Sequence, residues 1–189
     1  MLFVLSAPSG SGKTTIARNV LRHFDDLSFS VSATTRPKRP KEIDGRDYHF
    51  LSRDDFERRI EEDGLVEWEE IYGNLYGTLK SETDSAIGAG SHLLFDIDVK
   101  GALSLKRLYS DDAVLIFIRP PDLDVLRERL EHRGTDDETV IARRMQRAAW
   151  ELEQAPQFDH VVVNDDLARS IPEVERIIGI YMNGSKQQQ

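Results

Sequence analysis

The residues with the clearest chemistry form a short loop near the N-terminus. Residues 7–14 read APSGSGKT and fit the phosphate-loop pattern G-x-x-x-x-G-K-[ST] except at its first position, which is alanine. Glycines let the main chain turn its N–H groups inward around a polyphosphate, the lysine reaches the β- and γ-phosphate oxygens, and the threonine hydroxyl is a ligand for Mg²⁺. The loop therefore predicts nucleotide binding by Ala7, Pro8, Ser9, Gly10, Ser11, Gly12, Lys13 and Thr14.

A second candidate site lies in a basic segment that contains prolines. Residues 34–47 carry Arg36, Arg39 and three further lysine or arginine side chains, and Tyr48 follows them. Two guanidinium groups and a phenol suit a phosphate monoester dianion. A solvated run of charges is the alternative, and the residues alone leave both interpretations open.

Two aspartates and an arginine-rich stretch complete the candidates. Asp96 and Asp98 end an apolar run typical of a buried strand, at the sheet edge where α/β proteins bind ligands. Asp96 suits a Mg²⁺ site and Asp98 the acceptor side, although Asp98 also suits a helix cap. The arginines of residues 127–147 either face the active site or form ion pairs on an exposed helix.

The elements around these residues predict an α/β fold. Short apolar strands alternate with amphipathic helices, which indicates a parallel sheet covered on both faces. Leu2–Leu5 is the strand before the phosphate loop, and a helix starts at Lys13. Residues 34–90 interrupt the alternation with strands of their own. We also expect a strand over Phe29–Ser32, a helix over Arg53–Asp63 closed by Gly64, and a last helix that begins at Ser170.

The composition excludes several classes of protein. The 189 residues are 39% hydrophobic, which is enough to form a hydrophobic core. Their formal net charge of −9 makes a protein that binds along a nucleic-acid duplex unexpected. The absence of cysteine excludes disulfides, thiolate catalysis and cysteine-built metal sites. No apolar run approaches the roughly 20 residues of a membrane span. We expect a cytoplasmic protein without nucleic-acid or membrane partners, and the oligomeric state, monomer or homodimer, is left open.

Seven separate motifs resemble guanylate kinase in their order and spacing. They are SVSATTRPKR at residues 30–39, GRDY at 45–48, VEW at 66–68, YGT at 76–78, DID at 96–98, RGT at 133–135 and VNDD at 163–166. The resemblance runs from about residue 2 to about residue 181, and the alanine form of the phosphate loop is similar to that of bacterial members. It implies the P-loop nucleoside monophosphate kinase fold, with three layers and a parallel central sheet.

The resemblance also implies an organisation and a reaction. The implied parts are a core at residues 1–33, 91–121 and 155–189, a GMP-binding lobe at 34–90 and a helical lid at 122–154. The implied reaction transfers the γ-phosphoryl group of MgATP to GMP or dGMP, giving ADP and GDP, in purine nucleotide metabolism and GMP recycling.

Site residues follow by position in the matching motifs. Those implied to hold the GMP phosphate are Arg36, Arg39, Tyr48 and Tyr76, those implied to read guanine are Ser32, Glu67 and Thr78, and Asp98 is a further contact. Those implied to act on the transferring group are Lys13 and the lid arginines Arg129, Arg133 and Arg144. Thr14 and Asp96 are the expected metal residues, and Asn164 is implied to lie near the adenine of ATP.

The chemistry of guanine supports the role of Glu67. Guanine presents N1–H and N2–H₂ as adjacent donors that one carboxylate accepts together, whereas adenine lacks this donor pair. A good bidentate contact to a base is worth about 1–3 kcal/mol of discrimination. Two alternatives stay open: a guanylate-kinase-like interaction module without catalysis, and a P-loop kinase for another phosphorylated acceptor such as a ribose bisphosphate.

Overall fold

The computed structural model describes residues 1–71, 73–132 and 137–185, and a five-stranded parallel sheet lies at its centre. The strand order is β2-β7-β1-β8-β9, which confirms the predicted α/β fold with a parallel central sheet. We call this the first sheet. Its strands are β1 (Leu2–Ser6), β2 (Leu27–Phe29), β7 (His92–Asp96), β8 (Ala113–Arg119) and β9 (His160–Val163).

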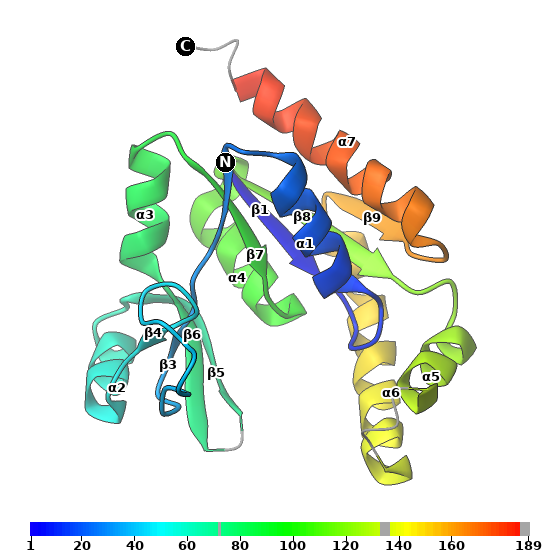
Figure 1. Cartoon of the computed structure of the whole chain (residues 1–189), viewed down its shortest axis with the longest axis horizontal. Coiled ribbons are helices and arrows are strands. Elements are labelled where there is room, and N and C mark those ends of the chain that lie inside the picture. Colours follow the sequence, from blue (N-terminus) through cyan, green and yellow to red (C-terminus); the bar gives the residue numbers. More distant parts are fainter. Residues whose placement is uncertain (72, 133–136, 186–189) are drawn as a thin grey trace.

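Helices cover both faces of the first sheet and make three layers. α1 (Lys13–His23) and α7 (Leu167–Ser185) lie on one face, and α4 (Val99–Tyr109) lies on the other (Figure 1). The period-two alternation of β1 explains this arrangement, because Phe3 and its neighbours at odd positions pack under α1 and α7 whereas Val4 packs under α4. Both faces of β1 are therefore fully buried, as the continuous apolar run predicts.

A second sheet of four strands stands beside the first sheet, on the left in Figure 1. Its order is β4-β3-β6-β5, where β4 spans His49–Phe50, β3 Ala33–Thr34, β6 Asn74–Leu79 and β5 Leu65–Ile71. α2 (Arg53–Glu61) packs on it around its own small cluster of Ala33, Phe56, Leu75 and Leu79. α3 (Lys80–Gly88) leads back to β7, and Val66 of β5 is buried in the cluster of the first sheet.

On the other side of the first sheet, α5 (Leu123–His132) and α6 (Glu138–Glu153) form a helical pair. Leu126 and Leu130 of α5 pack with Ile141 and Ala148 of α6 in a separate cluster. Two short 3₁₀ turns, Ser110–Asp112 and Ala155–Gln157, precede β8 and β9. Among the residues that the structure describes, no helix is both long enough and apolar enough to cross a bilayer.

The strand predicted over Phe29–Ser32 is wrong. β2 ends at Phe29, and the next strand, β3, starts at Ala33 in the other sheet. The intervening residues carry the chain from one sheet to the other, and the Ser30 main-chain N–H donates to Leu94 O at 2.9 Å on the way. Alternation of side chains does not distinguish one continuous strand from two short strands that belong to different sheets.

Two helix ends also differ from prediction. α2 is closed by Asp63 in the left-handed conformation, at φ 53°, and Gly64 follows it as the residue whose N–H reaches back to Arg59 O at 2.8 Å. α7 begins at Leu167 rather than Ser170, because the Asp166 carboxylate accepts a hydrogen bond from the Ala168 N–H at 2.9 Å and caps the helix earlier.

Candidate functional site

The phosphate loop follows β1 at the carboxyl edge of the first sheet. Gly10 (φ 95°) and Gly12 (φ 89°) both adopt left-handed backbone conformations, which turn the chain sharply into the N-terminus of α1. Gly12 is also the residue before α1, so its neighbours present main-chain N–H groups and the positive end of the helix to the same space. A cavity of about 600 Å³ is lined by all eight residues of the loop.

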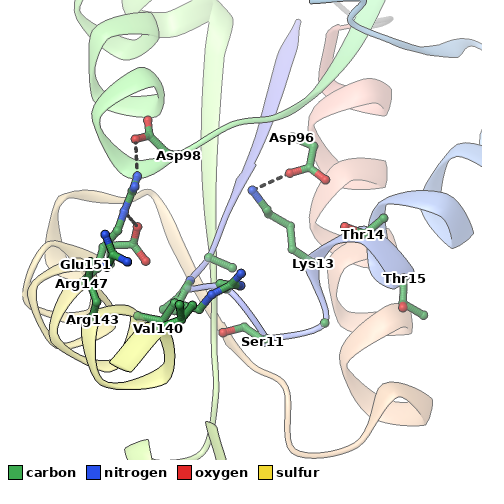
Figure 2. A pocket seen from close by; sticks show the side chains of 16 residues that line it. Ser11, Lys13, Thr14, Thr15, Asp96, Asp98, Val140, Arg143, Arg147 and Glu151 are labelled. Carbon is green, nitrogen blue, oxygen red and sulfur yellow. Dashed lines mark hydrogen bonds and ion pairs between the residues drawn. The ribbon is translucent and has the colours of Figure 1, made fainter. Parts of the chain in front are cut away.

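Two charged residues meet at one end of this cavity. Lys13 Nζ lies 2.5 Å from Asp96 Oδ1 and donates to Ile97 O at 3.1 Å (Figure 2). The pairing arises from the fold, because β1 and β7 are parallel neighbours and Leu5 pairs with Asp96, so the loop after one strand faces the end of the other. Thr14 and Asp96 both line the cavity, so the two predicted metal residues lie there, and Asp98 lines it as well.

Arginines of α6 line the opposite side of the cavity. Arg143, Arg144 and Arg147 all face it, and Arg144 Nη1 donates to Ser9 Oγ of the phosphate loop at 2.7 Å. Arg129 of α5 instead donates from Nη2 to Asn164 O at 2.9 Å. Arg133, the third predicted lid arginine, lies outside the described residues. The structure therefore places Arg144 at the phosphate loop and Arg129 at Asn164, which follows β9.

Asn164 is buried directly behind the phosphate loop. Its Nδ2 donates to Ser11 O at 2.7 Å, and its Oδ1 accepts from Ser170 Oγ at 2.8 Å. Its side chain packs so closely on Gly12 that a Cβ there would overlap the amide. Both ends of the Asn164 amide are thus occupied within the protein, which makes the side chain a support for the loop.

We expect Asn164→Ala to destabilise the protein by about 2–4 kcal/mol, because it leaves Ser11 O and Ser170 Oγ without a partner and opens a gap under the loop. Urea unfolding followed by circular dichroism measures this. Asn19→Ala is the matched control, since the Asn19 amide donates to Thr15 O within α1, at an exposed hydrogen bond, and its loss is expected to change stability by less than about 0.5 kcal/mol. Equal shifts for the two variants would contradict the supporting role.

The residues predicted to recognise guanine lie on β5, on β6 and just before β3. Glu67 and Thr78 are direct cross-strand partners, and Thr78 Oγ1 donates to Glu67 Oε1 at 2.7 Å. Thr78 is buried, and Ser32 immediately precedes β3, whose Ala33 pairs with Gly77 of β6. The three residues therefore converge from adjacent strands of the second sheet.

The Glu67 carboxyl group has an unusual environment. Burial raises its pKa to about 7, even though the hydrogen bond from Thr78 favours the charged form and lowers the pKa. The negative charges of Asp98 and Glu69 add to the increase. Gly101, in the first turn of α4, lies so close that a Cβ there would come within 3.0 Å of Glu67 Cγ. Glu67 is half-buried and lines a cavity, and the hydrogen bonds that lower its pKa both come from Thr78, so the carboxylate suits a ligand that brings more donors.

Three of the predicted phosphate-binding residues, Arg36, Tyr48 and Tyr76, lie together near β3, β4 and β6 of the second sheet. The Arg36 guanidinium lies 5.5 Å from the centre of the Tyr48 ring, and the Tyr48 and Tyr76 rings are 6.1 Å apart. Arg36 Nη2 also donates to Glu42 Oε1 at 2.7 Å, while the Arg39 main-chain N–H donates to Glu42 Oε2 at 2.8 Å. Arg36 holds the pKa of Glu42 below its ordinary value. A carboxylate thus already lies between the two positions predicted to hold a phosphate dianion.

Comparison with known proteins agrees with this geometry. The sequence model of the family described as guanylate kinase matches residues 1–181. The chain belongs to the guanylate kinase family. It is 50% identical to the guanylate kinase of Chlorobaculum tepidum over 181 residues, covering 96% of this chain and 93% of the relative. It is 52% identical to the guanylate kinase of Salinibacter ruber over 173 residues, covering 91% and 92%.

A solved structure extends the similarity to three dimensions. The crystal structure of guanylate kinase from Anaplasma phagocytophilum superposes with a TM-score of 0.71 at 29% identity, covering 96% of this chain and 85% of that chain. Membership of the guanylate kinase family confirms the resemblance stated from the motifs and the P-loop kinase fold that it implied.

Some residues around the guanylate kinase site were missed by the sequence interpretation. Glu42 lies between Arg36 and Arg39, and Arg147 and Glu151 of α6 line the cavity. Arg147 belonged to the arginines of residues 127–147, for which the sequence left the active site and an exposed ion pair both open. Its i,i+4 spacing from Glu151 is typical of a surface ion pair, so neither residue was singled out. Glu42 is one of three acidic residues in the basic segment, with Asp44 and Asp47, so the sequence did not single it out.

Proposed function

We propose that the protein transfers the γ-phosphoryl group of ATP to GMP, and to dGMP, giving ADP and GDP. The observation that carries the proposal is the convergence of two sites within one family fold. The phosphate loop with Lys13 and Asp96 forms one site, and the hydrogen-bonded pair of Glu67 and Thr78 forms the other. Asp98, at the N-terminus of α4, lines cavities on both sides and so lies between the two sites.

Direct in-line transfer accounts for the residues present. A phosphate oxygen of GMP, already anionic at neutral pH, forms the new bond to the γ-phosphorus as the bond to the β–γ bridging oxygen breaks and ADP leaves. This nucleophile requires no general base. Catalysis is then alignment of two anions and neutralisation of charge, for which we assign Lys13, Arg129, Arg133 and Arg144.

The residues at the loop suit Mg²⁺. The Thr14 hydroxyl and the Asp96 carboxylate line the same cavity and are the oxygen ligands that this cation prefers. We propose that they hold the Mg²⁺ that accompanies ATP. When bound, the cation supplies positive charge next to the β- and γ-phosphates.

The acceptor is assigned to the second sheet and the segment before it. We propose that Arg36, Arg39, Tyr48 and Tyr76 bind the GMP phosphate in place of the Glu42 carboxylate, and that Ser32, Glu67, Thr78 and Asp98 surround guanine. Support comes from the clustering of Arg36 with both tyrosines and from the half-buried Glu67, which accepts from Thr78 and lines a cavity. Asn164 is assigned to the adenine side as a support for the loop, since its amide is occupied by Ser11 and Ser170.

The parts of the molecule follow from these assignments. We propose that residues 34–90 are the GMP-binding lobe, that 122–154 are the lid, and that the remainder is the core. Separate hydrophobic clusters in the second sheet and in the α5–α6 pair support this division. The proposed location is the cytoplasm, where both nucleotides are available.

A coupled assay of ADP release tests the function. Purified protein with MgATP is offered GMP, dGMP, AMP, UMP, CMP and a ribose bisphosphate in separate reactions. We expect turnover with GMP and dGMP at rates well above the others. Absence of turnover with GMP would favour an interaction module, and preferred turnover of the ribose bisphosphate would favour a different kinase.

The raised pKa of Glu67 predicts how activity depends on pH. Guanine needs the charged carboxylate, so kcat/KM for GMP is expected to fall about tenfold per pH unit below a pKa near 7. A phosphate monoester loses its second charge near pH 6 and contributes its own decrease there. In Glu67→Gln the decrease near pH 7 should therefore disappear and the one near pH 6 remain. Identical profiles for the two proteins would contradict the role of Glu67.

A further inference from the structure

Arg147 of α6 contacts carboxylates from three parts of the molecule. Its Nη2 donates to Asp98 Oδ2, at the N-terminus of α4, at 2.9 Å, and its Nε donates to Glu151 Oε1, one turn along α6, at 3.0 Å. Its Nη1 lies 3.7 Å from Glu69 Oε1 on β5. Figure 2 shows Arg147 between Asp98 and Glu151, across the cavity from Lys13.

Asp98 has both of its carboxylate oxygens engaged. Oδ1 accepts from the Gly101 main-chain N–H at 2.8 Å and caps α4, and Oδ2 accepts from Arg147. The cap fixes one oxygen and the guanidinium fixes the other, so the plane of the carboxylate is set by two donors from different elements. Gly101 in turn packs against Glu67.

A second contact between the same two helices lies one turn further along. The Lys100 ammonium lies 5.8 Å from the centre of the Trp150 ring, at cation–π distance. Residues 147, 150 and 151 share one face of α6, because they are spaced i, i+3 and i+4. This face of α6 is therefore the one that meets the start of α4, and Arg147 is its contact with Asp98.

The carboxylates around this point would repel one another without a cation. Glu67, Glu69, Asp98 and Glu151 approach it from β5, α4 and α6, and Lys100 and Asp63 also line the cavity beside β5. Arg147 is the guanidinium within ion-pair distance of Glu69, Asp98 and Glu151.

We infer that Arg147 is a positioning residue for the acceptor site: it orients Asp98 and joins the α5–α6 pair to the guanine side of the cavity. The inference rests on the proposed function, since it assigns Asp98 to GMP. Arg147 acts through Asp98 and does not itself contact guanine. Its loss should weaken GMP binding and leave the donor site, held by the phosphate loop, unchanged.

Steady-state kinetics of Arg147→Gln test this inference. We expect KM for GMP to rise about fivefold, the size that a partly exposed ion pair supports, with kcat and KM for ATP within about twofold of the unchanged protein. Arg127→Gln is the matched control, because Arg127 forms an i,i+4 pair with Glu131 on the exposed side of α5, and it should change neither KM. An increase in KM for ATP, or an unchanged KM for GMP, would overturn the inference.

A double-variant cycle separates positioning from a general effect on folding. Asn caps helices as well as Asp does and keeps the shape of the side chain, so Asp98→Asn preserves α4 while weakening the bond to Arg147. Added to Asp98→Asn, Arg147→Gln should cause no further increase in KM for GMP. Additive effects would overturn the inference. Arg147→Lys, which keeps the charge beside Glu151, is the second variant if Arg147→Gln does not fold, and should raise KM for GMP by a smaller factor.

The same samples distinguish failure of this inference from failure of the proposed function. The unchanged protein is first assayed for ADP release with GMP. If that activity is absent, the proposed function fails irrespective of Arg147. If it is present and the variants behave otherwise than stated, only the role of Arg147 fails.

Discussion

Lys13→Ala is expected to reduce kcat for GMP phosphorylation by about 10³-fold or more. This is the range seen when an enzyme loses a positioned cation that stabilises the phosphoryl group during its transfer. Lys13 is the cation that follows Gly12 at the turn into α1, and it lies 2.5 Å from Asp96. Without it, the carboxylate of Asp96 faces the triphosphate with no countercharge from the loop. The coupled assay of ADP release measures the loss.

The loss should be the same for every acceptor, because Lys13 acts on the donor. Lys80→Ala is a matched control: it removes a lysine at the start of α3 whose main-chain N–H donates to Gly64 O and whose side chain does not line the nucleotide cavity. It should leave kcat within about twofold, as surface substitutions usually do. A kcat for Lys13→Ala within tenfold of that of the unchanged protein would contradict the catalytic role of Lys13.

Glu67→Gln is expected to lower kcat/KM for GMP by about 10- to 100-fold, since a bidentate contact to a base discriminates by about 1–3 kcal/mol. The amide of glutamine has one acceptor oxygen and offers an N–H to a guanine edge that presents donors. Slow turnover of AMP should stay unchanged. Competition between GMP and AMP in one reaction measures the ratio directly.

Glu70→Gln is the control for Glu67→Gln, because Glu70 lies on the same strand but is exposed and pairs only loosely with Arg53, at 3.8 Å.

The stability of Glu67→Gln gives an independent measurement. A folded-state pKa raised to about 7 means that the charged carboxylate destabilises the fold, an effect that grows from the ordinary pKa up to about 7. Glu67→Gln should therefore be more stable than the unchanged protein at pH 8, and the difference should shrink towards pH 5. A variant less stable at pH 8 would contradict the burial argument.

The fold was predictable where a local pattern decides it. The apolar run of β1 with the loop and α1 behind it predicts one layered unit, and the parallel sheet follows from repetition of that unit. The change of sheet at residues 30–32 was not predictable, because neither alternation nor propensity records which sheet a strand joins. The start of α7 was missed because Asp166 and Ser170 both suit a cap, and only packing shows that Ser170 instead bonds Asn164.

The site was predictable to the extent that residue types alone imply chemistry. The phosphate loop and Asp96 belong to that part, since parallel neighbours bring their ends together. The partners of the charged groups were not predictable from residue types. Glu42 beside Arg36, and Arg147 beside Asp98, are pairings between elements that depend on tertiary packing.

The route of the chain between its two sheets has a mechanical consequence. The connection runs through residues 30–32 in one direction and through α3 in the other, while Val66 of β5 is set into the cluster of the first sheet. Small torsional changes in such short connections can swing the second sheet as a rigid body, with Val66 as the pivot, and leave both hydrophobic clusters intact. A swing about that pivot would move Tyr48 and Arg36 through a longer arc than Glu67, so the phosphate end of an acceptor site would change its width more than the guanine end.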